Sequence, residues 1–388
     1  MAVLKKLFRP PRFGHDCGPV DKLVFTLILS VMSFIALRNI TVMLSYVTKF
    51  WWHLIVLGLA VYVGIKYVSI SQSKTAGSNL EGRKTKDVKE FILKEKRRLL
   101  ETYCEESSSL CYTVEDHPVL ENNELVVKRL LLYKDSDMFF VSTVELETPK
   151  VLTWENFNSR QWPVNKLVIH NVYTRLMIAM GFVMEALEFD SLEWQNTLMI
   201  GLGGGTQNNF LSAVDFIMVN LTTVELNPLM ATMAADWFGL EESRTNNVLV
   251  EDGVDFLSRA AQRGEKFKLI ILDACGDVSQ TRICPANDFM KSGVIKNIAR
   301  VLEDNGVLTV NIISSRDFAA NEEDVLAAYE KHFTTCFLLR YSEVQRLLVC
   351  TQREGWNFDK QKKRFMENFR NVDDRFDFGL ADIIYREN

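Results

Sequence analysis

Four glycines stand close together between an apolar segment and a predicted helix in the middle of the chain. The segment is TLMIGLGGGTQ, residues 197–207. Glycine permits a tight turn and lets a ligand approach the backbone, and the helix N-terminus beyond it favours negative charge. By itself the motif is also typical of a turn that binds nothing. The residues of this candidate loop are Gly201, Leu202, Gly203, Gly204 and Gly205.

An acidic residue follows each of the next three apolar segments. Glu225 in TTVELNP, next to Leu226, can accept hydrogen bonds from both hydroxyls of a ribose, because a carboxylate has two acceptor oxygens. Asp252, followed by Gly253, could accept a hydrogen bond from an adenine amine, and it could equally cap a helix. Asp273 ends the segment FKLIILD and would face the crevice in which α/β sheets bind ligands. Each acid alone could be a solvated turn residue, but the four features in succession predict a nucleoside site.

The elements around these residues are predicted to alternate between strand and helix. Helices are expected at 228–238 and 254–262, between apolar segments of strand length. This alternation predicts an α/β fold with a seven-stranded sheet and helices on both faces, so that the motifs meet at one sheet edge. The predicted strands are 197–200, 222–225, 247–250, 269–272, 307–312, 335–340 and 346–351.

The segment before this domain has a different pattern. Residues 71–110 are predicted to form a polar linker and a helix at 87–103, and residues 111–170 a small β-rich segment. Within that segment, strands are expected at 125–132 and 138–146, with a turn at 135–137. A helix at 171–187 then opens the main domain, which we place at 171–388.

The N-terminus predicts a membrane anchor. A basic tail, 1–22, precedes two mostly apolar stretches at 23–43 and 50–70. A spanning helix needs about 20 apolar residues, and each stretch reaches that length only if Arg38 or Lys66 lies near its end. We therefore expect an N-terminal transmembrane helical hairpin, although a single span is also compatible with the pattern.

Basic residues flank both outer ends of the predicted hairpin. By the positive-inside rule both ends would lie in the cytosol, so the main domain would face the cytosol from a membrane, with the endoplasmic reticulum as one candidate. A cleaved signal peptide is the alternative, because a basic region precedes an apolar run.

Composition excludes several classes of function. The net charge of −5 shows no excess of basic residues of the kind that binds nucleic acid, so no nucleic-acid partner is expected. The five histidines are not clustered, and no metal site is predicted. The seven cysteines are odd in number, scattered and without a CxxC pair, which favours reduced thiols in the cytosol over a disulfide framework.

Taken in order, GLGGG, VELNP, EDGVDFL and ILDA resemble the motifs of the spermidine synthase-like branch of the class I methyltransferases, whose fold is Rossmann-like. Within that branch the order is most similar to that of the C-terminal domain of methyltransferase-like protein 13. The resemblance covers about 171–315 and implies S-adenosylmethionine as the cofactor. It implies that the glycine loop holds the methionine part, Glu225 the ribose and Asp252 the adenine amine, with Gly253 beside the ring. It also implies that Asp273 orients an amine acceptor or serves as its base, and that the protein could form a homodimer.

The sequence departs from the spermidine synthases at two places. The acid of their GGGDGG loop is absent, and in their Asp-Ser-Ser-Asp stretch only Asp273 matches, since Gly276 takes the second acidic position and Asp277 is displaced by one. A diamine needs paired carboxylates for its ammonium groups. These departures favour methyl transfer to an amine of a protein or a small molecule over aminopropyl transfer from decarboxylated S-adenosylmethionine.

Two further alternatives remain open at this point. The domain could be a non-catalytic module that keeps the fold as an interaction platform. It could also be a nicotinamide dehydrogenase, although the third glycine of that motif is missing and Asp252 would have no role.

Overall fold

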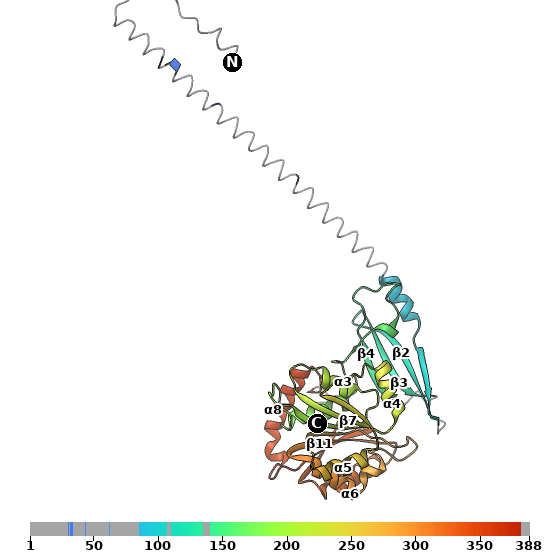
Figure 1. The fold of residues 1–388 in the computed structure, drawn as a ribbon, viewed down its shortest axis with the longest axis vertical. Coiled ribbons are helices and arrows are strands. Elements are labelled where there is room, and N and C mark those ends of the chain that lie inside the picture. The colour runs from blue at the N-terminus through green and yellow to red at the C-terminus, as the bar shows by residue number, and fades with distance from the viewer. Residues whose placement is uncertain are drawn as a thin grey trace, which may run out of the picture. The chain divides into compact units, whose positions relative to one another are not determined.

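The computed structural model describes residues 85–106, 110–134 and 140–381, together with Ser30, Met32, Ser33, Met43 and Tyr62. The chain separates into two units, Met1–Arg83 and Lys84–Asn388. The second unit contains the two sheets discussed below, with their helices (Figure 1).

A five-stranded antiparallel sheet forms the first part of this unit. Its strands pair in chain order, and the predicted strands at 125–132 and 138–146 are confirmed, although 135–139 lie outside the described residues. Asn122 and Asn123 both have positive φ, at 49° and 70°, which is the backbone of a tight two-residue hairpin turn. The strands are β1 (Arg98–Cys104), β2 (Cys111–Glu121), β3 (Glu124–Tyr133), β4 (Phe140–Leu146) and β5 (Val164–Asn165).

The prediction of a helix at 87–103 is wrong for the second half of that segment. Residues 85–94 are helical, but β1 (Arg98–Cys104) follows and pairs antiparallel with β2. The charged segment KEKRRLLETYC has no strong alternation, so its local pattern did not indicate a strand. Its backbone hydrogen bonds to β2 decide the conformation, which is a tertiary effect that overrides weak local propensity.

The second sheet carries the candidate site. Its main path runs β12-β13-β11-β9-β6-β7-β8, and β10 pairs with β11 off this path. The pairs from β11 to β8 are parallel, whereas β13 is antiparallel to both β11 and β12. All seven predicted strands are confirmed. The strands are β6 (Gln195–Ile200), β7 (Val219–Glu225), β8 (Asn246–Val250), β9 (Phe267–Leu272), β10 (Arg282–Cys284), β11 (Leu302–Ser314), β12 (Thr335–Arg340) and β13 (Gln345–Thr351).

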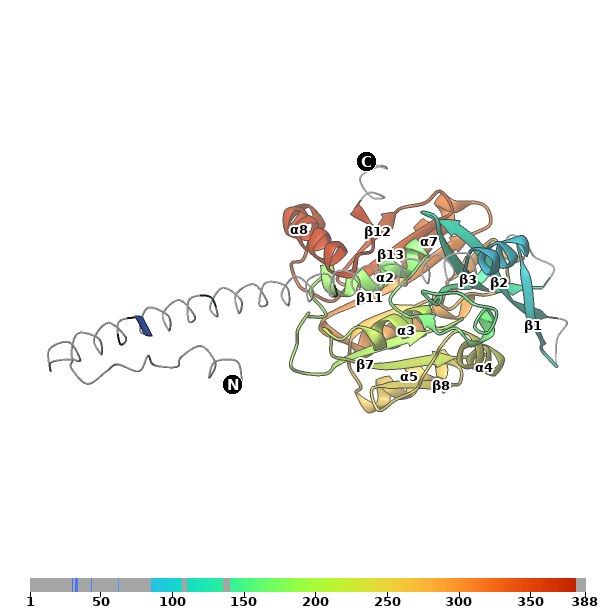
Figure 2. The same ribbon diagram turned by 90° about the horizontal axis from the view of Figure 1, so that it is seen from above.

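Helices cover both faces of this sheet (Figures 1 and 2). Side chains alternate between the two faces along a strand. On β6, Met199 packs in one core with α2, α3 and α8, whereas Leu198 and Ile200 pack in another core with α5, α6 and α7. The predicted class I methyltransferase fold, which is Rossmann-like, is therefore confirmed. The helices are α2 (Val172–Val183), α3 (Thr206–Ala213), α4 (Pro228–Trp237), α5 (Gly253–Arg263), α6 (Ser292–Val301), α7 (Phe318–Glu330) and α8 (Phe358–Phe376), and the 3-10 turns are η2 (Ser159–Gln161) and η3 (Asn287–Met290).

The two sheets share a small apolar core around α4. Met230 and Met233 of α4, with Phe238 just after it, pack against buried residues of the first sheet such as Val114 and Leu131. This contact matters for function, because it holds the five-stranded sheet beside the helix that follows Glu225.

The expectation of reduced cysteines is wrong for six of them. Disulfides join Cys104 to Cys111, Cys275 to Cys284 and Cys336 to Cys350. The first and third pairs are direct cross-strand neighbours, so the strand register creates them, and no spacing in the sequence indicates it. Cys17 lies outside the described residues.

The predicted membrane location is corrected. In the part of the chain that the structure describes, no helix combines the length and the apolar character needed to cross a bilayer. The stretches 23–43 and 50–70, on which the prediction depended, lie outside the described residues except for five isolated helical positions. Both stretches had reached spanning length only by including Arg38 or Lys66, so hydropathy alone was a weak basis for the anchor.

Candidate functional site

The strand register brings the sequence motifs to one edge of the second sheet. Ile200, the last residue of β6, stands opposite Val224 on one side and Leu272 on the other. Because these strands are parallel, the residues that follow them lie together at the carboxyl edge. Gly201, Glu225 and Asp273 therefore share that edge, as the sequence predicted.

The glycine loop is shaped by neighbouring parts of the chain. Gly201 has a φ of 97°, and a Cβ atom there would lie 2.4 Å from the carbonyl oxygen of Asp273. A Cβ atom on Gly204 would lie 2.7 Å from the Cβ atom of Ser142, in β4. These two glycines are thus needed for the approach of β9 and of the first sheet, in addition to any role in binding a ligand.

Most backbone amides of the loop already have acceptors. The amide of Leu202 donates to Glu225 Oε2 at 2.8 Å, and that of Gly204 to Ser142 Oγ at 2.8 Å. The amide of Gly205 donates to the carbonyl of Leu202 at 2.9 Å and closes a turn. Because these N–H groups are already paired, a ligand would contact the glycine loop mainly through the shape of its backbone.

Glu225 is the central side chain of the candidate site. It is buried, and its second oxygen, Oε1, accepts the amide of Asn227 at 2.8 Å. Each carboxylate oxygen can accept more than one hydrogen bond, so both retain capacity for ribose hydroxyls. Leu226, immediately after it, leaves 70% of its surface exposed, which would suit the covering of an apolar ring face.

Asp252 occupies the N-cap position of α5, as the alternative interpretation expected. Its Oδ1 accepts the amide of Val254 at 2.7 Å, and its side chain is exposed. Gly253 is buried, and a Cβ atom there would lie 2.8 Å from Cγ2 of Ile200. A cap uses one carboxylate oxygen, so the other oxygen remains free for an adenine amine.

Substitutions at Asp252 should separate these two roles. Asp252→Asn keeps a capping oxygen and should change the free energy of unfolding by only a few tenths of a kcal/mol, whereas Asp252→Ala should lower it by about 1 kcal/mol. Urea unfolding measures that difference. If Asp252 also binds adenine, both variants should bind S-adenosylmethionine more weakly in calorimetry. Equal affinity of the parent and both variants would mean that Asp252 only caps α5.

Asp273 lies in a polar cluster beneath the sheet edge. Asn311 of β11 donates from Nδ2 to Asp273 Oδ1 at 2.7 Å. Burial raises the pKa of Asp273, and hydrogen bonds from Asn311 and from Tyr173 of α2 partly oppose that rise. Burial, followed by the charge of Asp273, also raises the pKa of Tyr173. The carboxyl group is therefore held in place and is closer to neutrality than an exposed aspartate.

Two shielded oxygen atoms beside this cluster have no hydrogen-bond partner among the described residues. They are Oδ1 of Asn311 and the hydroxyl of Tyr341. Tyr341 lies near enough to Tyr173 and Asp273 for their negative charge to contribute to its raised pKa, after burial. Unsatisfied buried acceptors are unfavourable, and an incoming amine could satisfy them.

The loop after Asp273 is fastened at its base. The Cys275–Cys284 disulfide closes it, and the amide of Ala286 donates to the carbonyl of Ala274 at 2.9 Å. Asp277 is exposed, and its Oδ1 accepts the amide of Ser279 at 2.8 Å, which lowers its pKa. The second acid noted in the sequence thus caps a turn, and no interaction joins it to Asp273 in the described part of the chain.

Sequence reasoning missed the contribution of the first sheet. Glu105, beside the Cys104–Cys111 disulfide, accepts Nδ2 of Asn227 at 2.7 Å. Burial raises the pKa of Tyr133 in β3, and the negative charges of Glu105, Asp277 and Glu225 raise it further. Glu105 and Tyr133 thus lie near Asn227 and Glu225, and nothing in their local sequence indicated it. Asn311 did carry a signal, as the amide within the apolar run VLTVNIIS.

Comparison with known proteins supports relationship over part of the chain. The sequence is 24% identical over 173 residues to the eEF1A lysine and N-terminal methyltransferase homolog of Drosophila melanogaster, covering 44% of this chain and 25% of the relative. It is 28% identical over 158 residues to the human eEF1A lysine and N-terminal methyltransferase, covering 39% and 22%. A polyamine aminopropyltransferase of Vibrio vulnificus is 26% identical over 122 residues, covering 31% and 38%. These relatives confirm the predicted resemblance to the spermidine synthase-like methyltransferases.

Two solved structures are also similar to parts of this chain. Human methyltransferase-like protein 13 in complex with SAH has a TM-score of 0.45 and 24% identity, covering 52% of this chain and 93% of that one. A probable spermidine synthase from Corynebacterium glutamicum has a TM-score of 0.49 and 12% identity, covering 70% and 85%. No protein-family model matches the sequence. The chain spans about a quarter of the length of the two eEF1A methyltransferases that it matches.

Proposed function

We propose that the protein is an S-adenosylmethionine-dependent methyltransferase that acts on an amine. The observation that carries this proposal is the meeting of Glu225, Asp252 and Asp273 at the edge where the glycine loop turns. The names of the Drosophila and human relatives, which specify lysine and N-terminal methylation of eEF1A, support a protein amine as the acceptor.

The residues present suit the proposed cofactor. Glu225 has free acceptor capacity for the ribose hydroxyls, and one oxygen of Asp252 is available to the adenine amine. Leu226 would cover the ring, and Gly253 lets the backbone pass close to it. The loop from Gly201 to Gly205 would accommodate the methionine part through its shape.

In the proposed reaction Asp273 binds the acceptor nitrogen and removes its proton. An ammonium group cannot attack until it loses a proton, and a carboxylate whose pKa is raised by burial is a better base than an exposed one. Asn311 fixes the orientation of that carboxylate, and its free Oδ1 and the Tyr341 hydroxyl can accept the remaining amine protons. When bound, S-adenosylmethionine supplies a methyl group on a positively charged sulfur, and the carbon–sulfur bond breaks as the carbon–nitrogen bond forms. The chain's own contribution is thus proximity, orientation and proton removal.

Aminopropyl transfer from decarboxylated S-adenosylmethionine is the second candidate, and the match to the Vibrio aminopropyltransferase favours it. Against it, Asp277 points to solvent in a turn and leaves Asp273 without the paired carboxylate that a diamine requires. A non-catalytic module is the third candidate. A homodimer stays a prediction from the resemblance.

Calorimetry of the full-length protein with S-adenosylmethionine, its decarboxylated form and NAD tests the proposal. We expect S-adenosylmethionine to bind most tightly. Glu225→Ala should weaken that binding about 10- to 100-fold, because hydrogen bonds to a charged group are worth about 1.5–3 kcal/mol.

Two controls accompany the Glu225 experiment. Glu193→Ala removes an exposed carboxylate elsewhere and should leave the affinity unchanged. Thermal unfolding of Glu225→Ala is needed because that variant also loses the acceptor for the amides of Leu202 and Asn227. A folded Glu225→Ala protein that binds as tightly as the parent would refute the ribose assignment, and no binding by the folded parent would refute the proposed function.

A further inference from the structure

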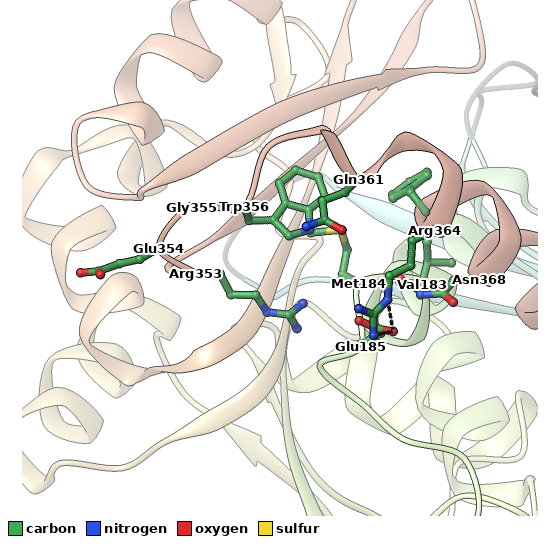
Figure 3. Close-up of a pocket in the computed structure, with 11 residues that line it drawn as sticks. Val183, Met184, Glu185, Arg353, Glu354, Gly355, Trp356, Gln361, Arg364 and Asn368 are labelled. Carbon is green, nitrogen blue, oxygen red and sulfur yellow. Dashed lines mark hydrogen bonds and ion pairs between the residues drawn. The ribbon is translucent and has the colours of Figure 1, made fainter. Parts of the chain in front are cut away.

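A pocket lies at the edge of the second sheet opposite to the candidate active site. It has a volume of about 230 Å³ and is formed by the end of α2, the segment after β13 and the first turns of α8 (Figure 3). Thr351, the last residue of β13, pairs with Val307, whereas Gln345 at the start of β13 pairs with Ile313. Since Asp273 and Glu225 lie at the other ends of the parallel strands, this pocket is separate from the proposed cofactor site.

Arg353 brings a positive charge to this pocket, and its guanidinium group forms only part of its possible hydrogen bonds. One of its terminal nitrogens donates to the carbonyl of Asn305 at 2.8 Å. Its Nε atom is shielded from solvent and has no hydrogen-bond partner among the described residues. Burial lowers the pKa of Arg353, the negative charge of Glu185 partly opposes that shift, and the positive charge of Arg364 adds to it. A shielded donor on a cation is costly when unpaired, and an anionic acceptor would remove that cost.

The two acids of the pocket do not pair with Arg353. Glu185 Oε1 accepts Nε and a terminal nitrogen of Arg364 at 3.0 and 2.7 Å, so this acid is occupied by the other arginine. Glu354 is exposed, and Figure 3 shows its carboxylate directed away from the guanidinium of Arg353. The pocket therefore presents one guanidinium group with no carboxylate bound to it.

The rest of the lining combines apolar and polar side chains. Trp356 stacks on Phe337 with ring centroids 5.3 Å apart and planes inclined by 18°, so the indole is held in a fixed orientation. Val183, Met184 and Phe365 lie along the pocket but are buried, and Gln361 and Asn368 contribute amides. A ligand for this site would need an acidic group at Arg353 and a compact apolar body against the indole.

We propose that this pocket binds a small organic carboxylate with an apolar or aromatic body. A planar guanidinium matches the two oxygens of a carboxylate, and an indole face suits a flat apolar group. One unpaired arginine and a cavity of about 230 Å³ fit a single carboxylate on a ring-sized body. This site does not depend on the proposed methyl transfer.

Binding of three probes to the full-length protein tests the proposal. Benzoate, its neutral analogue benzamide and inorganic phosphate are compared by ligand-observed magnetic resonance and calorimetry. We expect benzoate to bind at least tenfold more tightly than benzamide and phosphate. Arg353→Gln should abolish that preference, and Trp356→Leu should weaken benzoate binding while retaining a preference for the anion.

Matched variants keep the result interpretable. Arg244→Gln removes an exposed arginine elsewhere and should leave benzoate binding unchanged. Glu225→Ala should also bind benzoate normally, which separates this site from the proposed cofactor site. Because Arg353→Gln also loses the bond to Asn305, its folding is checked by thermal unfolding, and Arg353→Lys should retain part of the anion preference. Equal binding of benzoate and benzamide to the parent, tighter binding of phosphate, or unchanged benzoate binding by both Arg353→Gln and Trp356→Leu would overturn the proposal.

Discussion

Asp273→Asn should reduce the rate of the proposed methyl transfer about 10²- to 10⁴-fold, the range expected when a positioned acid–base group is lost. The amide has nearly the same shape as the carboxyl group, so the contact with Asn311 can persist after the amide reorients. The amide can neither take a proton nor attract an ammonium group. The affinity for S-adenosylmethionine should stay close to that of the parent, since Glu225 and Asp252 are unchanged. Turnover at saturating cofactor and calorimetry measure the two quantities.

The pH dependence of the same variant gives a sharper test. The parent should lose activity as the pH falls through the raised pKa of Asp273, because only the ionised carboxylate can accept a proton. This acidic limb should be absent in Asp273→Asn. Stability should change in the opposite sense: a raised pKa in the folded state means that Asp273 contributes most below its unfolded pKa, and this contribution is lost as the pH rises through the folded value. The Asn variant should therefore gain stability relative to the parent over that interval.

Asp277→Asn is the matched control for Asp273. Its carboxylate lies in an exposed turn, so its loss should change turnover by less than a few-fold. If Asp277→Asn abolished turnover as Asp273→Asn does, the paired-acid site of an aminopropyltransferase would become the better hypothesis. An unchanged rate in Asp273→Asn would exclude this residue as the base.

Arg129→Met should lower the free energy of unfolding by about 3–5 kcal/mol, the usual effect of removing one partner of a buried ion pair. Arg129 and Asp116 each expose only 3% of their side chains, and two hydrogen bonds of 2.8 and 3.1 Å join them. Arg129 also donates to the carbonyls of Trp237 and Ser159, at 3.1 and 2.9 Å, and so connects β3 to the end of α4. Its removal leaves a buried carboxylate without a partner and loosens the first sheet from the site. Urea unfolding measures the change.

A second substitution shows how much of that loss in stability comes from the unpaired carboxylate of Asp116. Arg129→Met combined with Asp116→Leu should recover part of the stability, because no unpaired carboxylate then remains buried. The exposed pair of Lys128 and Glu121 offers the comparison, and Lys128→Met should change stability by no more than about 1 kcal/mol. A loss of the same small size in Arg129→Met would mean that the buried pair does not fasten the two sheets.

Strong periodic segments explain why the second sheet was predictable. Its seven predicted strands are mostly apolar segments bounded by turn residues, and the sheet is covered on both faces, so the local pattern and the final environment agree. For the same reason Glu225, Asp252 and Asp273 could be placed at one edge: a side chain that ends a parallel strand goes to the edge that all such ends share.

Predictions from the sequence were wrong where the local residue pattern and the tertiary environment disagree. Arg98–Cys104 became a strand through pairing with β2, and the scattered cysteines became disulfides through strand register. The apolar N-terminal runs suggested a membrane location that the described residues do not support. In the first two cases the deciding interaction is strand pairing, which a local pattern of residue types does not record.

The amino-acid sequence alone determined the α/β fold, the glycine loop and the three acids at the carboxyl edge of the sheet. These features depend on short segments and on the geometry of parallel strands. Only the tertiary structure decided how those acids are used. It joined Glu225 to Leu202, placed Asn311 against Asp273, turned Asp277 outward and brought Tyr133 of the first sheet near Glu225. Hydrogen-bond partners and burial set the charge and orientation of a carboxylate, and both depend on side chains that the fold gathers from distant parts of the chain.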